Sequence, residues 1–207
     1  MNEELSPSPR SEKKGGSMRP LLLGLGAALV VGGTVGGLFY FGVLGMTPQE
    51  KHAEAMVLLQ TGDTAQALPL LRESAEKAYA PAYLELGRCA AEGIGMAQDA
   101  AVALTHYQAA AGLGYAPAQS LLAACYEAGT GAPADSAEAA RWYRAAAEQG
   151  DMESQYKTAL HCTTENRVEE AAGWYLAAAD QGHAAAAAAL AACYAMVPEW
   201  SRMPPKR

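Results

Sequence analysis

Apolar and polar positions follow two different patterns along the 207 residues of the chain. Residues 21–46 form an unbroken run without a charged side chain. From residue 48 to residue 195, apolar residues instead recur at three- and four-residue spacing between polar positions. The first pattern is typical of a transmembrane helix and the second of amphipathic helices. The sequence therefore predicts an all-α chain in which one transmembrane helix precedes a domain of packed helices.

The apolar run at residues 21–46 is long enough to cross a membrane. A helix rises roughly 1.5 Å per residue, so the 26 residues outspan a hydrocarbon core of about 30 Å. A cleavable signal peptide is the main alternative. Its apolar region extends over roughly 7–15 residues and ends at a small-x-small site, which the VLG at residues 43–45 does not provide. We therefore favour a retained anchor over a cleaved leader.

The charges that flank this run predict its orientation. Lys13, Lys14 and Arg19 precede it, whereas only Lys51 follows it closely. Because cytoplasmic flanks gather Lys and Arg, we expect the N-terminus in the cytoplasm and the helical domain outside it. In a bacterium, that domain would lie in the periplasm, anchored to the inner membrane. Residues 1–20, with an SPSP run and mixed charges, are expected to form a disordered cytoplasmic tail.

Small residues recur every four positions within the apolar run. Gly24, Ala28, Gly32 and Gly36 would form a flat stripe on one face of the transmembrane helix. Two such faces can approach closely, as in GxxxG dimers, so a homodimer through this stripe is one interpretation. The other is that glycine is simply common in membrane helices. The motif alone does not decide between them.

A longer motif repeats through the helical domain. The strings HYQAAAGLG, WYRAAAEQG and WYLAAADQG begin at His106, Trp142 and Trp174, at steps of 36 and 32 residues. A degenerate earlier copy begins at Leu70, and a last half-copy begins at Ala186. Such periods are typical of stacked helical hairpins, none of which can bury its apolar face alone. We therefore expect one continuous core shared between neighbouring hairpins.

Residues that begin and end helices recur at the same period. They comprise glycines that end a helix, aspartates that cap the next one and prolines that fit a first turn. These residues are Gly93 and Gly129, Asp99 and Asp135, and Pro81 and Pro117. Helices are predicted at residues 48–60, 64–78, 81–92, 99–113, 117–128, 135–149, 152–163, 167–181 and 184–195. The repeat domain is thus expected at residues 47–195, followed by a C-terminal tail at residues 196–207.

These repeats resemble the SEL-one-like repeat (SLR) family, a branch of the tetratricopeptide-like (TPR-like) solenoids. The copy at residues 116–151 matches best, the copy at residues 80–115 nearly as well, and the copy at residues 152–183 lacks the Gly-x-Gly loop. The best copy matches through Leu122, Tyr126, Gly129, Gly131, Asp135, Ala139, Trp142, Tyr143, Ala146 and Gly150. The resemblance implies a right-handed α-solenoid of antiparallel helix pairs. It also implies an adaptor or scaffold that grips other proteins, and not an enzyme.

The charge balance bears on the partner. Residues 1–20 carry four basic and three acidic side chains, which leaves eleven basic and nineteen acidic residues, a net charge of −8, in the remainder. An acidic domain is repelled by phosphate backbones, so we expect no nucleic-acid partner.

The histidines do not predict a metal or catalytic site. His52, His106, His161 and His183 show no paired-ligand spacing, so no metal and no cofactor is expected. His106 stands where sister repeats have tryptophan and is interpreted as a packing substitute. His161 precedes Cys162, but adjacent helical residues point about 100° apart and do not readily form a nucleophile–base pair.

The cysteines follow the repeat. Cys89, Cys125 and Cys193 occupy the same repeat position, and Cys162 lies one residue off it. Equivalent positions are a whole repeat apart, whereas a disulfide needs Cα atoms within about 7 Å. We therefore interpret the cysteines as small buried residues, although an irregular bridge stays open for a domain in an oxidising compartment.

The resemblance also implies where a partner would bind. In tetratricopeptide-like stacks, the first helix of each hairpin lines the concave face, and this surface suits an extended peptide or a helix. The corresponding residues here are Leu84, Arg88, Glu92, Ser120, Ala124, Glu127, Tyr156 and Leu160.

Two other functions stay open beside the scaffold. Some secreted cysteine-rich relatives have been linked to penicillin-type ligands, which suggests a cell-wall-related binding or enzyme-like role. Against it, the chain contains no Ser-x-x-Lys nucleophile motif. The second is a structural membrane oligomer that the glycine stripe holds together, with the repeats as a spacer.

Overall fold

The computed structural model describes residues 45–196, which form nine α-helices and no strand. Every boundary lies within two residues of its prediction. The helices are α2 (Pro48–Thr61), α3 (Thr64–Glu76), α4 (Ala80–Glu92), α5 (Ala100–Gly112), α6 (Ala116–Ala128), α7 (Ser136–Glu148), α8 (Met152–Thr164), α9 (Val168–Asp180) and α10 (Ala184–Met196). The all-helical class is therefore confirmed.

The predicted membrane segment lies almost wholly outside the described residues. Of residues 21–46, only the last two are described, and the glycine stripe and the tail at residues 1–20 are not. The predicted C-terminal tail is described only at Met196, which ends α10. Among residues 45–196, no helix has both the length and the apolar character that crossing a membrane requires.

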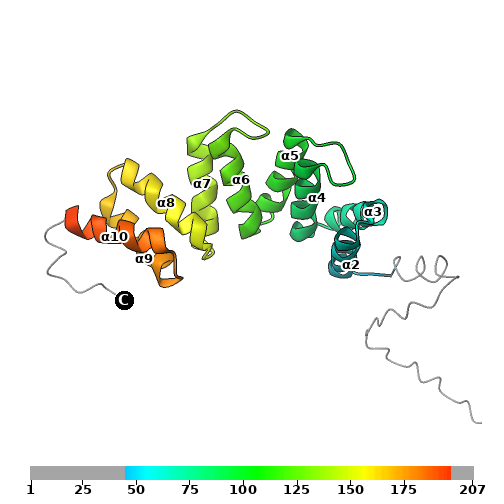
Figure 1. Ribbon diagram of the computed structural model, residues 1–207, viewed down its shortest axis with the longest axis horizontal. Helices are drawn as coiled ribbons and strands as arrows, with labels where there is room; N and C mark the ends of the chain where they lie inside the picture. The colour runs from blue at the N-terminus through cyan, green and yellow to red at the C-terminus, as the bar shows by residue number, and fades with distance from the viewer. Residues whose placement is uncertain (1–44, 197–207) are drawn as a thin grey trace, which may run out of the picture.

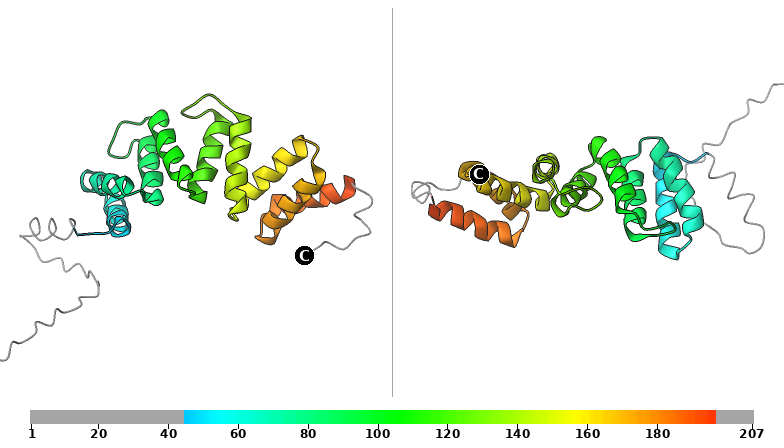
Figure 2. Two further views of the ribbon diagram at one scale, coloured as in Figure 1. Left: turned by 180° about the vertical axis from the view of Figure 1, so that it is seen from behind. Right: turned by 90° about the horizontal axis from the view of Figure 1, so that it is seen from above.

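The helices form a solenoid of hairpins. Helix α2 packs on α3, α4 on α5, α6 on α7 and α8 on α9, and each hairpin packs on the next through α3/α4, α5/α6, α7/α8 and α9/α10. The hairpins follow one another along the long axis of the molecule, from α2 at one end to α10 at the other (Figures 1 and 2). Helix α10 ends the described stack as an unpaired first helix.

The predicted helix boundaries have their expected physical causes. The Asp99 carboxylate accepts hydrogen bonds from the first-turn N–H groups of Ala101 and Val102, at 2.9 and 3.0 Å. Asp135 caps α7 in the same way. Gly93 ends α4 in the left-handed conformation, with φ of 75°. These caps satisfy backbone groups that a helix end leaves unpaired.

Small residues on the first helices make room for buried tyrosines on the second. A Cβ atom added at Gly87 would lie 2.4 Å from the ring of Tyr107, so only glycine lets this ring lie against α4. In the next two hairpins, alanine suffices: Ala123 clusters with Tyr143, and Ala159 clusters with Tyr175. All three tyrosines are buried, so this contact holds each hairpin together.

A chain of glutamines joins successive hairpins. The buried Gln119 of α6 donates to the Ala111 carbonyl at the end of α5, at 3.3 Å, and accepts from Gln149, which follows α7, at 2.7 Å. Gln155 and Gln181 repeat this arrangement one hairpin later, at 2.8 Å from each other. Each buried amide is thereby paired with the end of a neighbouring helix.

The Gly-x-Gly loops lie against the preceding hairpin. A Cβ atom at Gly131 would lie 2.3 Å from the carbonyl oxygen of Ala100 and 3.2 Å from Leu104, both on α5. Gly95 meets Thr64 and Leu68 of α3 in the same way. The loop between α8 and α9 has only residues 165–167, against residues 129–135 between α6 and α7, and it lacks this contact segment. The two longer loops project from the same side of the stack in Figure 1.

Candidate functional site

The residues predicted to meet a partner lie on the first helices α4, α6 and α8. Seven of the eight are at least partly accessible: Arg88, Glu92, Ser120, Ala124, Glu127, Tyr156 and Leu160. The prediction is wrong for Leu84, which is only 7% exposed. Leu84 packs in the cluster that α4, α5 and α6 share, so its side chain is not free for a partner.

Ser120 and Tyr156 already have contacts within the stack. The Ser120 hydroxyl lies 3.1 Å from that of Ser154 on α8 and so joins two hairpins. The Tyr156 ring stacks on His183, with centroids 4.4 Å apart, and lies 5.9 Å from the Tyr175 ring. Tyr156 therefore supports the α8/α9/α10 packing and offers a partner only part of its surface.

One residue of each first helix forms an exposed row. Arg88, Ala124 and Leu160 occupy the same position in α4, α6 and α8, and all three are exposed. The row changes from a guanidinium to a methyl group to an isobutyl group. A partner laid along it would meet a charged end and an apolar end.

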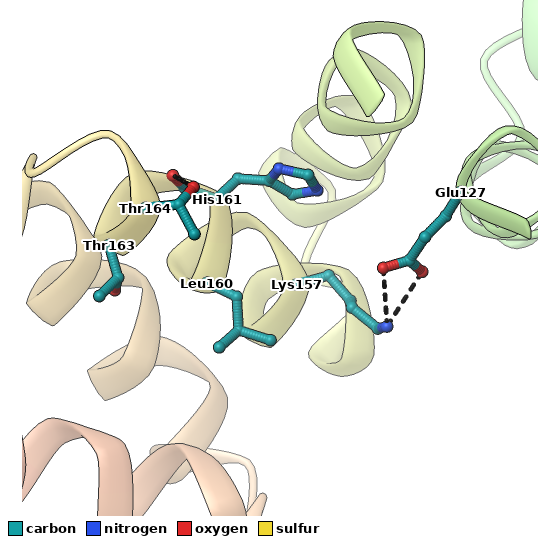
Figure 3. A pocket seen from close by; sticks show the side chains of 6 residues that line it. All are labelled: Glu127, Lys157, Leu160, His161, Thr163 and Thr164. Carbon is teal, nitrogen blue, oxygen red and sulfur yellow. Dashed lines mark hydrogen bonds and ion pairs between the residues drawn. The ribbon is translucent and has the colours of Figure 1, made fainter. Parts of the chain in front are cut away.

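A hollow of about 270 Å³ opens beside the apolar end of this row. We call it the first-helix hollow, because every lining residue belongs to α6 or α8. The lining residues are Glu127, Lys157, Leu160, His161, Thr163 and Thr164. Figure 3 shows Glu127 on α6 reaching across to Lys157 on α8, with Leu160 and His161 pointing in different directions from α8. The hollow thus spans the junction between two hairpins.

A hydrogen-bonded group of charges forms one wall of this hollow. Glu127 accepts from the Lys157 ammonium at 3.0 and 3.2 Å and from the Tyr143 hydroxyl at 2.8 Å. Partial burial raises the pKa of Glu127, but these hydrogen bonds outweigh it, so that pKa lies below its ordinary value. Burial, followed by the bond to Glu127, raises the pKa of Tyr143. This wall is therefore an ion pair at neutral pH.

Sequence reasoning missed four residues of this hollow: Lys157, His161, Thr163 and Thr164. The repeat register contains the signal that would have identified two of them. Lys157 and His161 lie in α8 at the positions of Leu121 and Cys125 in α6. They directly follow Tyr156 and Leu160, which the sequence does predict to meet a partner.

The cysteines pack as predicted, with one exception. Cys89, Cys162 and Cys193 are buried, Cys125 is half-buried, and all four are free thiols. Burial raises the pKa of each of them, which keeps the thiols protonated and unreactive. Within residues 45–196, no group of three or more His, Cys, Asp or Glu side chains is placed to hold a metal ion.

His106 packs as a substitute for tryptophan. Its ring lies 6.3 Å from that of Tyr83 in the preceding helix. Burial, and then the charge of Arg72, lower the pKa of His106. The ring is thus held neutral in an aromatic contact.

Comparison with known proteins agrees with this architecture. Residues 80–115, 116–151 and 163–183 match the family model of the Sel1 repeat. A Sel1 repeat protein from Oxalobacter formigenes is 30% identical, with a TM-score of 0.63 over 69% of this chain and 60% of that one. A protective antigen present in uropathogenic Escherichia coli strains, which displays an SLR fold, is 31% identical, with a TM-score of 0.67 over 77% of this chain and 36% of that one. No curated protein matches the chain.

The class that these findings define is an α-helical solenoid containing Sel1 repeats. They support the expected resemblance to the SEL-one-like repeat family, whose members generally act as protein-interaction scaffolds. The chain spans only 60% and 36% of the length of the two solved proteins. The third repeat match begins at residue 163 and so omits most of α8. The first-helix hollow thus lies where the chain departs from the family pattern.

Proposed function

We propose that this chain is a membrane-anchored scaffold that holds a partner protein along α4, α6 and α8. The observation that carries the proposal is the exposed row Arg88, Ala124 and Leu160 leading to the first-helix hollow. The row takes one exposed residue from each of three successive hairpins, so it forms a narrow continuous surface across them. Such a surface suits an extended or helical segment, which gains affinity from many small contacts.

The anchor is the finer part of this proposal. It rests on the 26 uncharged residues at 21–46 and on the basic residues before them. With the N-terminus inside, the repeats would present their partner surface on the extracytoplasmic side. A topology reporter fused after Arg207 tests this part alone: activity in the cytoplasm would overturn the proposed orientation and leave the partner surface untouched.

Site-specific crosslinking tests the partner surface. A photo-reactive residue at Leu160 or Ala124 is expected to capture one partner from intact membranes. The matched control is the same residue at Val102, an exposed apolar position on the second helix α5. Capture of the same partner at equal yield from Val102 would contradict the proposal.

A double variant measures what the row contributes. Arg88→Ala combined with Leu160→Ala is expected to weaken capture by about tenfold or more, since each is an exposed contact at one end of the row. Tyr156→Ala is a poorer test, because the Tyr156 ring stacks on His183 and its loss would loosen the stack itself. Unchanged capture by the double variant, with unchanged helicity, would exclude this surface.

A further inference from the structure

The hairpin α8/α9 departs from its sisters at three positions that lie close together. Thr158 stands where α4 and α6 have the buried leucines Leu86 and Leu122. Arg167 stands at the N-cap, where α3, α5 and α7 have capping aspartates, and α9 has no side-chain cap. The connecting loop is four residues shorter than in the two preceding hairpins.

These departures meet at a second hollow, of about 240 Å³, between α7, α8 and the start of α9. We call it the arginine hollow. Its lining residues are Ala140, Arg141, Arg144, Thr158, His161, Cys162 and Arg167. Ala140 is the equivalent of Leu104, the residue that Gly131 of the next loop approaches in the full repeat. The hollow therefore lies where a longer loop would cover α7 and a leucine would fill the core.

The lining is rich in positive charge although the domain is acidic. Residues 45–196 contain five arginines, Arg72, Arg88, Arg141, Arg144 and Arg167, and three of them line this hollow. Arg144 and Arg167 both pair with Glu170, and Arg167 pairs with Glu165 as well. Arg141 pairs with Glu138 at 2.7 Å. The shared carboxylate of Glu170 shows that two guanidinium groups converge on one position that an oxyanion occupies.

Two further features around the hollow favour an anion: an unpaired hydroxyl and an uncapped helix N-terminus. Thr158 is 4% exposed, and its hydroxyl oxygen has no hydrogen-bond partner among the described residues. An unpaired buried hydroxyl destabilises a protein, so a hydroxyl in this leucine position favours a function that needs it. The first N–H groups of α9 also lack a side-chain cap, and a helix N-terminus favours negative charge.

We propose that the arginine hollow binds an oxyanion, a phosphate or carboxylate group, which takes the place of the Glu170 side chain between Arg144 and Arg167. Each guanidinium offers five N–H donors in a planar fork, which suits either group. The α9 N-terminus supplies favourable backbone dipoles from the third side. This site is independent of the first-helix surface, apart from His161, which lines both hollows.

The test uses the full chain in detergent micelles, titrated at constant ionic strength with inorganic phosphate and separately with citrate. Backbone amide signals of Thr158 and Val168 are expected to shift with saturation. Saturation by phosphate alone would assign a phosphate group, and saturation by citrate alone a carboxylate group. If neither anion saturates these signals, the proposal is overturned.

Substitutions test which residues bind the anion. Arg144→Gln is expected to weaken binding by about tenfold or more, because a charge-assisted hydrogen bond is lost. The matched control is Arg72→Gln, which changes the equivalent position of α3 and should leave binding unchanged. Glu170→Ala removes the internal competitor and is expected to strengthen binding several-fold, an effect opposite in sign to that of a merely damaged fold.

The last test is a substitution that fills the hollow. Thr158→Leu restores the residue that the sister helices α4 and α6 have, and should abolish saturation while helicity is retained. Undiminished binding by Thr158→Leu, or equal weakening by Arg72→Gln and Arg144→Gln, would show that the anions interact with the surface at large. Either result would overturn the site.

Discussion

The two full repeats at residues 80–151 and the short hairpin α8/α9 have the same helix lengths but different interiors. Helices α4 to α9 all have 13 residues, and each hairpin has its buried tyrosine against a small residue. The full repeats add a buried leucine and a capping aspartate, whereas the short one has Thr158 and Arg167. The tyrosine contacts that hold each hairpin together are thus independent of the leucine that fills its core and of the aspartate that caps its second helix.

This difference explains where the two hollows lie. Both hollows include residues of α8, which buries no leucine, whereas α4 buries Leu86 and α6 buries Leu122. In a solenoid, each hairpin contacts only its neighbours, so one hairpin can depart from the pattern without unfolding the rest. Both hollows therefore involve the hairpin that lacks the buried leucine of the full repeats.

Exchanging the core residue tests the comparison most strongly. Leu122→Thr in α6 is expected to lower the free energy of unfolding by about 2–4 kcal/mol, because a fully buried leucine is replaced by a smaller side chain with an unpaired hydroxyl. Thermal or urea unfolding followed by circular dichroism measures it.

The reverse exchange is the control. Thr158→Leu should raise the stability or leave it unchanged, since the hollow beside Thr158 has room for the larger side chain. If Thr158→Leu destabilises the chain as much as Leu122→Thr does, the two hairpins are packed alike and the comparison fails.

The loop contact gives the second test. Gly131→Ala is expected to cost about 2–3 kcal/mol, because its Cβ would meet the Ala100 carbonyl at 2.3 Å and φ is +80°. Gly150→Ala is the matched control: it also has a positive φ, of +93°, but a Cβ atom there meets nothing within 4 Å. The control should cost only about 1 kcal/mol. Equal losses would mean that the long loop does not support the preceding hairpin.

A smaller effect is expected at the turn after α3. Ala78 has φ of +57°, at the position where the later repeats have Gly114, Gly150 and Gly182. Ala78→Gly relieves a left-handed alanine and should gain about 0.5–1 kcal/mol, after the extra freedom of glycine in the unfolded chain is subtracted. A loss of stability in the same unfolding assay would show that the turn tolerates alanine without strain.

The repeat period predicted the architecture, because helix caps and small-residue spacing are local signals. As the sequence predicts, Pro81 lies in the first turn of α4, Gly93 ends that helix and Asp99 caps α5. The error at Leu84 has a different cause: its side chain lies in the cluster that α4, α5 and α6 share, so its burial depends on tertiary packing. The absence of the Gly-x-Gly loop can be read from the sequence, but the arginine hollow cannot, because it depends on how α7, α8 and Arg167 pack together.

The junction between a full repeat and the short hairpin provides the smallest expected effect. Lys157 and Tyr143 hold the pKa of Glu127 below its ordinary value, although partial burial raises it. A lowered pKa in the folded state means that the stabilisation is present above the unfolded pKa and is lost as the pH falls through the folded one.

Glu127→Gln should therefore lower the melting temperature slightly at pH 7, by an effect below about 1 kcal/mol, since the pair is partly exposed. The difference from the parent should shrink as the pH falls through the lowered pKa of Glu127 and the carboxylate becomes protonated, and it should also shrink in high salt. Glu148→Gln, an exposed change on α7 of the same repeat, is the control. A deficit in Glu127→Gln that persists unchanged at low pH would show that the junction depends on the shape of this side chain, not on its charge.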